Sequence, residues 1–367
     1  MIDASTDGLL TDVAEAYDAH FGTPAEAVAF APGRVNLLGE HTDYNGGLVL
    51  PMPLRLGTAM AAGQSDPPGR LRVASASFEG EETRDLTESA SGAWSDYVLG
   101  SFRNAPGLKE GAGLTAMVAS NLPMGAGLSS SAAIEVCTLR IADILFGTET
   151  DPVETALLAR KVENAFVGMP CGIMDQFAVS VGEPGHALFL DTRTLRHHPV
   201  RLPGGQSFLV VHSGETHKLT DGGYAARVAE CRAACEALGV EMLSELTPDD
   251  VDRIEALPEP LNRRARHVVT ENDRVQRGAK ALEAGDAAGF AELMIASHRS
   301  QSADYAVSLP EIDALVDAAL AAGAIGARLT GGGFGGSIVA LIADDKLAEV
   351  ADSLTAQFPK ARVLAAT

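Results

Sequence analysis

The segment APGRVNLLGEHTDYNGG, Ala31 to Gly47, places a polar run between two apolar stretches whose composition indicates β-strands. The Asn-Gly-Gly at its end is typical of a tight turn between strands. Two interpretations are open. The run is either a hairpin loop, or a site where charged and hydroxyl side chains bind a hydroxyl-rich ligand such as a sugar. The polar side chains in question are Arg34, Glu40, His41, Thr42 and Asp43.

The bulk composition limits the partners of this chain. Its 367 residues, 46% of them hydrophobic, are enough to bury a large core, and at this length we expect two domains. The formal net charge is -21, from 49 acidic and 28 basic residues, so the surface repels nucleic acid and anionic membranes. An anionic substrate would therefore need a metal ion, an arginine or backbone N–H groups at its site.

The N-terminal residues and the cysteines predict a cytoplasmic protein. The opening MIDASTDGLL has neither a basic start nor a long apolar run, so we expect no signal peptide and no membrane partner. The four cysteines, Cys137, Cys171, Cys231 and Cys235, form no C-x-x-C pair. Reduced, buried thiols fit this pattern best.

Hydrophobic spacing predicts a mixture of helices and strands. The expected elements are a helix over 10–21, strands over 27–62 around the turn, strands over 71–78 and 113–120, helices from the glycine-serine loop to 146 and from 151 to 168, a strand over 208–212, and helices near 222–238, 261–283 and 310–322. Gly22 and Gly147 are expected to end helices, and Asp151 to cap one. This order predicts an α+β fold rather than regular βαβ winding.

A glycine-serine loop, LPMGAGLSSSAA, spans Leu122 to Ala133. Its glycines let backbone N–H groups approach a ligand, and its three serines lie at an expected helix N-terminus, which attracts anions. The loop lacks the Lys of a Walker A motif, and Ser130 stands where a dinucleotide-binding turn has its third glycine. A serine-rich helix cap without a ligand is the alternative, but we favour a triphosphate site, because three serines exceed the need of one cap.

A second glycine run, LTGGGFGGSIVAL, spans Leu329 to Leu341. It contains a formal G-x-G-x-x-G at Gly331, Gly333 and Gly336. The apolar residues from Ser337 onward indicate a strand, whereas a dinucleotide-binding loop must open a helix. A bulged hairpin and a loop that closes over a cleft both remain open.

Two carboxylates are candidate functional residues because apolar residues surround them in the sequence. Glu163 borders an apolar helix face, so it needs either an ion pair with Arg160 or Lys161, or a magnesium ion shared with a triphosphate. Asp175 follows a turn, and could cap a helix or act as a general base. From spacing alone the cap is favoured. Arg34 offers a planar fork suited to phosphate or carboxylate.

Together, four segments resemble the GHMP small-molecule kinase family, in the family's order and over nearly the whole chain: GRVNLLGEHTDYNGG, PMGAGLSSSAA, ENAFVGMPCGIMDQFA and LTGGGFGGS. The resemblance implies a two-domain α+β fold. Residues 1–188 would form an N-terminal domain with a mixed sheet and helices, and residues 189–367 a ferredoxin-like C-terminal domain. The family's active site lies in the cleft between its two domains.

The resemblance also implies an activity, namely transfer of the ATP γ-phosphate to the C1 hydroxyl of α-D-galactose with Mg²⁺ as cofactor. The implied partners are galactose and ATP, and the implied state is a monomer. Alternatives are a kinase for N-acetylgalactosamine, arabinose or another alcohol, and a non-catalytic regulator that binds galactose and ATP. Such a regulator is expected to be damaged in the serine loop or at the base, whereas Ser130, Ser131, Ala132 and Asp175 are intact here.

Site roles follow from the resemblance residue by residue. Asp175 matches the base, and Arg34 matches the arginine that steadies the transferring charge. The sugar-contacting positions match Glu40, His41, Thr42, Asp43, Gly172, Asp175 and Tyr224. The nucleotide loop matches Gly125, Ala126, Gly127, Leu128, Ser129, Ser130 and Ser131, and the magnesium ligands match Ser131 and Glu163. One departure follows Tyr224, where Ala225 and Ala226 stand instead of the family's asparagine and later arginine pair.

Overall fold

The computed structural model describes residues 6–65, 68–123, 125–216 and 220–366. By internal contacts the chain forms two compact units. The first consists of Met1–Arg34, Leu54–Met124 and Leu128–Val181, and the second of Val35–Pro53, Gly125–Gly127 and Gly182–Thr367. All residues after Val181 belong to the second unit. The domain boundary near residue 188 stays a prediction.

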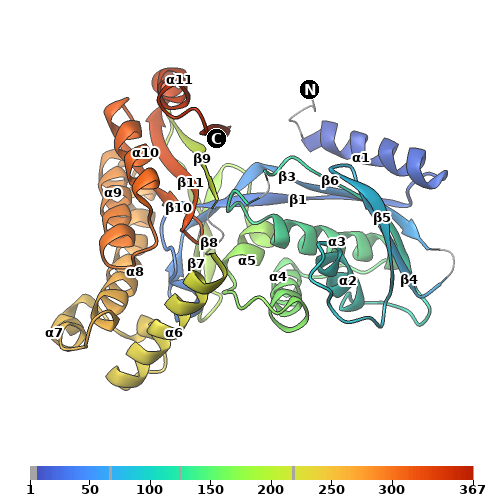
Figure 1. Cartoon of the computed structure of the whole chain (residues 1–367), viewed down its shortest axis with the longest axis horizontal. Coiled ribbons are helices and arrows are strands. Elements are labelled where there is room, and N and C mark those ends of the chain that lie inside the picture. The colour runs from blue at the N-terminus through green and yellow to red at the C-terminus, as the bar shows by residue number, and fades with distance from the viewer. Residues whose placement is uncertain (1–5, 66–67, 124, 217–219, 367) are drawn as a thin grey trace. The chain divides into compact units, whose positions relative to one another are not determined.

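A mixed five-stranded sheet organises the first unit. Its order is β1-β3-β6-β4-β5, with β4 and β6 parallel and the pairs β3/β6 and β4/β5 antiparallel. The strands are β1 (Ala27–Asn36), β3 (Pro51–Gln64), β4 (Arg70–Ser75), β5 (Phe78–Asp85) and β6 (Leu114–Ser120). Figure 1 shows α1 on one face and, on the other, α2 (Ser95–Arg103), α3 (Ser130–Phe146), α4 (Pro152–Lys161) and α5 (Met174–Val181).

Helix α1 (Thr6–Phe21) packs on the sheet through residues at helical spacing. Its buried side chains Leu9, Val13 and Tyr17 cluster with strand residues that include Ala59 and Met117. These three lie four residues apart and therefore share one helix face. The periodicity that predicted the helix thus also determines which face is buried.

The residues that the sequence predicts to begin and end helices do so in the structure. Gly22 follows α1 with φ 76°, and Gly147 ends α3 in the left-handed conformation at φ 67°. The Asp151 carboxylate caps α4 by accepting a hydrogen bond of 2.8 Å from the Val153 N–H. Both kinds of signal depend on the residues next to the helix end, which is why they can be recognised in a sequence.

The expected continuous helix to Gly168 is wrong in its last part. Helix α4 ends at Lys161, and Val162–Val167 forms a π-helical turn. Val162 and Phe166 pack so closely on Gly100 of α2 that a Cβ at Gly100 would meet each of them at 2.6 Å. Tertiary packing thus favours the wider turn, which places Glu163 on the inner side, where it is buried.

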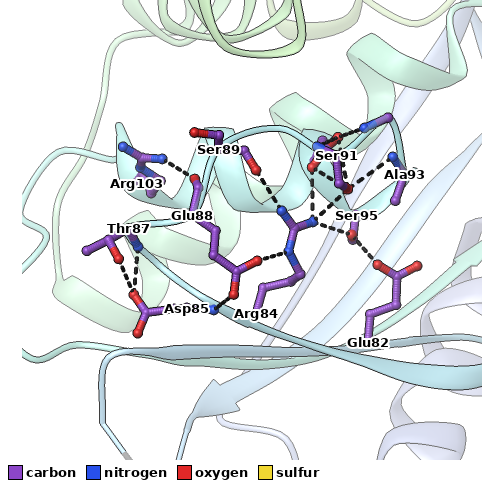
Figure 2. Close-up of polar contacts among 12 residues, drawn as sticks. Glu82, Arg84, Asp85, Thr87, Glu88, Ser89, Ser91, Ala93, Ser95 and Arg103 are labelled. Atoms are coloured by element: carbon purple, nitrogen blue, oxygen red, sulfur yellow. Dashed lines mark hydrogen bonds and ion pairs between the residues drawn. The ribbon is translucent and has the colours of Figure 1, made fainter.

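A buried arginine ties the start of α2 to strand β5 (Figure 2). Arg84 donates from Nε to Glu88 at 2.6 Å and from Nη1 to Asp96 at 3.0 Å. Asp96 also accepts from the N–H groups of Ser91 and Gly92. Burial alone would raise the pKa of Asp96, but these hydrogen bonds lower it overall. The loop between β5 and α2 is therefore held by charge and hydrogen bonds rather than by an apolar core.

The second unit contains an antiparallel four-stranded sheet of order β10-β11-β9-β12 and a three-stranded sheet of order β2-β7-β8. The strands are β2 (Leu48–Val49), β7 (His186–Asp191), β8 (His197–Arg201), β9 (Gln206–Thr216), β10 (Gly326–Thr330), β11 (Gly335–Ala343) and β12 (Arg362–Ala366). The helices are α6 (Thr220–Leu238), α7 (Val251–Glu255), α8 (Leu261–Glu283), α9 (Ala287–Ala303), α10 (Pro310–Ala321) and α11 (Leu347–Gln357). In Figure 1, α8, α9 and α10 lie together beside β10 and β11.

The expected helices near 222–238, 261–283 and 310–322 correspond to α6, α8 and α10. Helices α2, α7, α9 and α11 were not predicted from the sequence. All four cysteines are free thiols, as the cysteine pattern predicts. Cys137, Cys231 and Cys235 are buried as expected, whereas Cys171 is only partly buried. Among the described residues, no helix combines the length and apolar character needed to cross a membrane.

Candidate active site

The predicted site residues fall into two groups, each within one unit. The first unit holds Arg34, Leu128, Ser129, Ser130, Ser131, Glu163, Gly172 and Asp175. The second holds Glu40, His41, Thr42, Asp43, Gly125, Ala126, Gly127 and Tyr224. Each group has a geometry of its own.

In the first unit, Arg34 and Asp175 form a two-point ion pair. Arg34 Nε donates to Asp175 Oδ1, and Nη2 donates to Oδ2, both at 2.8 Å. Ser129 Oγ donates to Oδ2 at 2.7 Å. Arg34 is buried, whereas the Asp175 side chain remains 31% exposed. Asp175 is therefore oriented by side chains of β1 and the serine loop rather than acting as a helix cap, and it can still meet a ligand.

Ser129 adopts the left-handed conformation at φ 60° just before α3. Such a conformation costs about 1 kcal/mol for a residue other than glycine, and here it accompanies the hydrogen bond to Asp175. The Ser129 side chain makes no cap hydrogen bond to α3, so the serine-cap interpretation does not describe this part of the chain. In the loop before it, Gly125 and Gly127 are exposed, which suits close approach of an anion to the backbone.

Glu163 is buried in the π-helical turn beside polar partners from two other segments. The Ser131 hydroxyl, the Cys171 thiol and the Gln176 amide donate hydrogen bonds to its carboxylate. Burial, and then the charge of Asp175, raise the pKa of Glu163 to about 7. The described ion pairs do not join Glu163 to Arg160 or Lys161, the alternative that the sequence left open.

A second buried carboxyl group, Glu135 of α3, was not predicted from the sequence. Burial, and then the charge of Glu163, raise the pKa of Glu135 to about 10, so it is neutral at pH 7. The Gln176 amide lies 3.4 Å from Glu135 and also binds Glu163, so it bridges the two carboxyl groups. A signal for Glu135 existed, because it lies four residues after Ser131 and therefore on the same helix face.

This acidic cluster suits a divalent cation. Glu163 and Ser131 offer neighbouring oxygens. Burial, and then the charge of Asp175, raise the pKa of Glu163, and a bound cation would offset that neighbouring negative charge. No group of three His, Cys, Asp or Glu side chains within the described ranges could hold a metal by itself. Magnesium, however, usually takes one or two carboxylates and completes its shell with phosphate oxygens and water. The residues present therefore fit Mg²⁺ bound together with a nucleotide.

In the second unit, Glu40 is buried and held from two sides. Its Oε1 accepts from the Gly331 N–H at 2.8 Å, and its Oε2 accepts from Asn36 Nδ2 at 2.9 Å. The fully buried Arg328 lies 3.7 Å from Oε1, and it also lies 3.9 Å from Glu271. Through Glu40, the polar run after β1 is therefore bound to the glycine loop after β10 by a hydrogen bond and by a buried ion pair.

The other members of the polar run differ in exposure. Thr42 is buried, and its hydroxyl lies 2.8 Å from the Gly39 carbonyl and 2.6 Å from the Leu48 carbonyl, which closes the loop. Of the four residues 40–43, only Asp43 is partly exposed. Asp43 begins a short 3-10 turn. It is thus the acceptor in the run that a ligand can reach most directly.

His41 uses both ring nitrogens in hydrogen bonds with the protein. Nδ1 lies 3.0 Å from the Tyr44 hydroxyl, and Nε2 lies 3.1 Å from the Gly332 carbonyl. Burial, and then the charge of His267, lower the pKa of His41 to about 3, so the ring is neutral. The structure also brings Tyr224 to this run, with ring centroids 5.6 Å from His41 and 5.4 Å from Tyr44.

The two glycine runs meet within the second unit. Strands β10 and β11 form a hairpin that is paired without interruption from Gly326 to Thr330, so the hairpin interpretation is confirmed. The register shift between Gly335 and Ser337 lies where β11 pairs with β9. Ser337 Oγ donates to the Ala126 carbonyl at 2.8 Å, and a Cβ at Gly331 would lie 3.3 Å from the Gly127 carbonyl oxygen. Glycine at 331 thus permits close backbone contact between the runs. Closure of this loop over a cleft stays a prediction.

Comparison with known proteins gives three family matches. The galactokinase galactose-binding signature matches residues 15–64, the GHMP kinases N terminal domain matches 96–183, and the GHMP kinases C terminal model matches 279–360. The galactokinase of Chloroflexus aggregans is 41% identical over 95% of this chain and 92% of its own length. The human galactokinase is 40% identical over 91% of this chain and 88% of its own length.

A solved structure shows the same fold. The crystal structure of Lactococcus lactis galactokinase complexed with galactose matches 96% of this chain and 97% of its own, with a TM-score of 0.90 at 32% identity. The similarity therefore spans both units. The two-domain α+β fold expected from the resemblance is confirmed.

Proposed function

Since the chain belongs to the galactokinases of the GHMP kinase family, we propose that it transfers the γ-phosphate of ATP to the C1 hydroxyl of α-D-galactose, giving galactose 1-phosphate and ADP. The observation that carries this proposal is the oriented carboxylate of Asp175, held by Arg34 and Ser129 at the start of the serine loop. Such an arrangement suits the activation of a hydroxyl next to a phosphate.

Asp175 acts as the base toward the sugar hydroxyl, with Arg34 as its partner. Three hydrogen bonds to its carboxylate fix its direction. A carboxylate is a weak base, but it suffices, because phosphoryl transfer passes through a loose transition state dominated by positioning and charge neutralisation. Arg34 then balances negative charge near the reacting oxygens.

The backbone N–H groups of Gly125 to Ser131 bind the phosphates at the N-terminus of α3. Ser131 and Glu163 hold Mg²⁺, which supplies charge neutralisation when it is bound with the nucleotide. Ser131, Gln176 and Cys171 orient the Glu163 carboxylate through their hydrogen bonds. Glu163 thereby keeps a defined position despite the repulsion from Asp175.

The segment Glu40 to Asp43, together with Gly172 and Tyr224, binds the sugar in this proposal. Galactose is neutral, so its selection depends on hydroxyl pairing, and Asp43 is the partly exposed acceptor for that task. We propose a cytoplasmic monomer whose partners are galactose and ATP. Intact Ser131 and Asp175, in the geometry described, favour catalysis over a purely regulatory role.

The proposal is tested by measuring ADP release with galactose, glucose, N-acetylgalactosamine and arabinose in the presence of MgATP. We expect galactose to be the preferred substrate and phosphorus NMR to show a C1 phosphate. If another sugar were phosphorylated faster than galactose, that sugar would replace galactose as the proposed substrate. Galactose binding without ADP release would support the regulatory alternative instead.

A further inference from the structure

Helix α8 holds the backbone before and after the Glu40 side chain. Glu271 Oε1 accepts a hydrogen bond of 2.8 Å from the Gly39 N–H, and His267 Nε2 lies 3.1 Å from the Glu40 carbonyl oxygen. A carbonyl cannot donate, so His267 Nε2 is the donor. His267 and Glu271 lie four residues apart and therefore share one face of the helix. This face of α8 fixes the main chain at Glu40.

The Glu40 side chain is held by a different part of the second unit, the end of β10 and the loop after it. The Gly331 N–H donates to Glu40 Oε1 at 2.8 Å. Arg328 Nη2 lies 3.7 Å from Glu40 Oε1 and 3.9 Å from Glu271 Oε1. Both distances are longer than a hydrogen bond, so Arg328 acts on the two carboxylates through its charge. It can therefore stabilise the charge of Glu40 without itself taking one of the lone pairs of the carboxylate.

Arg328 is fixed in an interior that offers it few hydrogen bonds. The residue is 0% exposed, and its Nε and Nη1 make no hydrogen bond with the residues that the structure describes. In the amide orientation that satisfies both of its polar groups, Gln301 donates to the Leu329 carbonyl at 3.3 Å and accepts from Arg328 Nη2 at 2.9 Å. Gln301 thus orients the nitrogen that lies near both carboxylates. A buried guanidinium with so few hydrogen bonds is costly, and this cost calls for a reason beyond packing.

Glu271 supplies a compensating charge of fixed position. Its Oε2 accepts from Arg274 Nε at 2.6 Å, and its Oε1 accepts from the Ser297 hydroxyl at 2.7 Å. Burial would raise the pKa of Glu271, but the charges of Arg274 and Arg328 lower it overall, so Glu271 is ionised at pH 7. This anion therefore keeps Arg328 in place next to Glu40.

We propose that Arg328 is a positioning residue of the sugar site that acts through Glu40, and that Glu271 and Gln301 hold Arg328 in place. This inference rests on the proposed function, in which Glu40 is one of the residues that bind the sugar. It gives a task in substrate binding to residues of β10, α8 and α9 that were not candidates in the sequence. The guanidinium keeps the Glu40 carboxylate in the direction set by the Gly331 N–H, so a sugar hydroxyl meets an acceptor that is already oriented.

Arg328→Lys is the test variant, because lysine keeps the positive charge but lacks the planar fork that Gln301 orients. We expect it to weaken galactose binding by about tenfold, with little change in kcat at saturating sugar. Gln301→Met removes the amide at similar volume and should give a smaller loss of the same kind. Arg84→Lys, at a buried arginine of the first unit, is the matched control and should bind galactose as the wild type does. Calorimetry with galactose in the absence of nucleotide measures all three affinities.

A panel of deoxygalactoses shows whether Arg328 acts through Glu40. Glu40→Gln identifies the hydroxyl that Glu40 binds, because the analogue lacking that hydroxyl should bind the wild type and Glu40→Gln nearly equally. The same analogue should bind the wild type and Arg328→Lys nearly equally, while the other analogues show the full loss. Arg328→Lys should also add little to the loss in Glu40→Gln. An equal loss for every deoxygalactose in Arg328→Lys is the result of a purely structural role and would overturn the proposal.

Amide hydrogen exchange measured by NMR tests this support without any sugar. We expect the Gly331 N–H to exchange at least about tenfold faster in Arg328→Lys, because its acceptor Glu40 loses its fixed orientation. The Ile325 N–H, which binds the Leu341 carbonyl at 2.9 Å, is the internal control and should exchange at an unchanged rate. An unchanged rate at Gly331 would also contradict the proposal. Absence of galactose binding to the wild type would instead remove the proposed function and leave the exchange rate at Gly331 to decide whether Arg328 orients Glu40.

Discussion

Arg34 and Asp175 stand 141 residues apart in the chain, yet their side chains meet in two parallel hydrogen bonds of 2.8 Å. One partner lies on strand β1 and the other in the first turn of helix α5. The pair gives the first unit a carboxylate of fixed orientation that still reaches solvent. A base with these properties can be tested directly.

Asp175→Asn should lower kcat by about hundredfold or more, because an amide cannot accept the proton of the sugar hydroxyl. Galactose affinity should change much less, since the amide keeps the size of the carboxylate. Steady-state kinetics and calorimetry measure the two effects, and Asp18→Asn on the exposed side of α1 is the control. Near-normal kcat in Asp175→Asn would make Asp175 a positioning residue only.

Glu163→Gln should raise the Mg²⁺ concentration needed for half-maximal rate by at least about tenfold, because it removes the charge of a proposed ligand. Glu135→Gln is a matched control, since the raised pKa of Glu135, about 10, means that the native group is already neutral at pH 7. Titration of the initial rate with Mg²⁺ compares the variants. Equal Mg²⁺ requirements would exclude Glu163 as a ligand.

Asp43→Ala should raise the galactose KM by about tenfold and reduce the preference for galactose over glucose, because a hydrogen-bond acceptor for the sugar is lost. The exposed Asp249 of the same unit provides the control variant Asp249→Ala. Competition between the two sugars measures the preference. An unchanged galactose-to-glucose ratio would mean that selectivity comes from another residue.

Arg328→Met should destabilise the protein by about 3–5 kcal/mol, because Glu40 and Glu271 would then be buried without their shared cation. Arg362→Met, at an exposed position in the same sheet, should have little effect. Urea unfolding at neutral pH measures the difference. Equal stability of the two variants would show that Arg328 is not needed to balance these carboxylates.

The Arg84–Asp96 pair should make stability depend on pH at the acidic end. The pKa of Asp96 is lowered in the folded protein. The ionised Asp96 therefore stabilises the fold at pH values above the pKa of the unfolded chain, about 3.9. This stabilisation is lost as the pH falls through the pKa of the folded protein. Asp96→Asn should cost about 3 kcal/mol at pH 7 and less in acid. Urea unfolding at several pH values measures this, with Asp18→Asn at an exposed position of α1 as the control. A pH-independent difference would contradict the assignment.

The sequence predicted those features that neighbouring residues determine. The cap at Asp151, the glycine stops at Gly22 and Gly147, and the buried face of α1 all follow from local spacing. The candidate site could be predicted in outline because the four motifs resemble a known family. The π-helical turn at Glu163 could not, because it accompanies the packing of Phe166 and Val162 on Gly100.

By itself, the sequence determined the helix ends marked by Gly22, Gly147 and Asp151, the mixture of helices and strands, and which polar residues were candidates for the chemistry. Only the tertiary structure decided what each candidate does. It pairs Arg34 with Asp175, holds Glu40 with the Gly331 N–H and engages both nitrogens of His41. The physical reason is that a side chain's role depends on which donors and acceptors surround it, and in a folded core these come from segments distant in the chain.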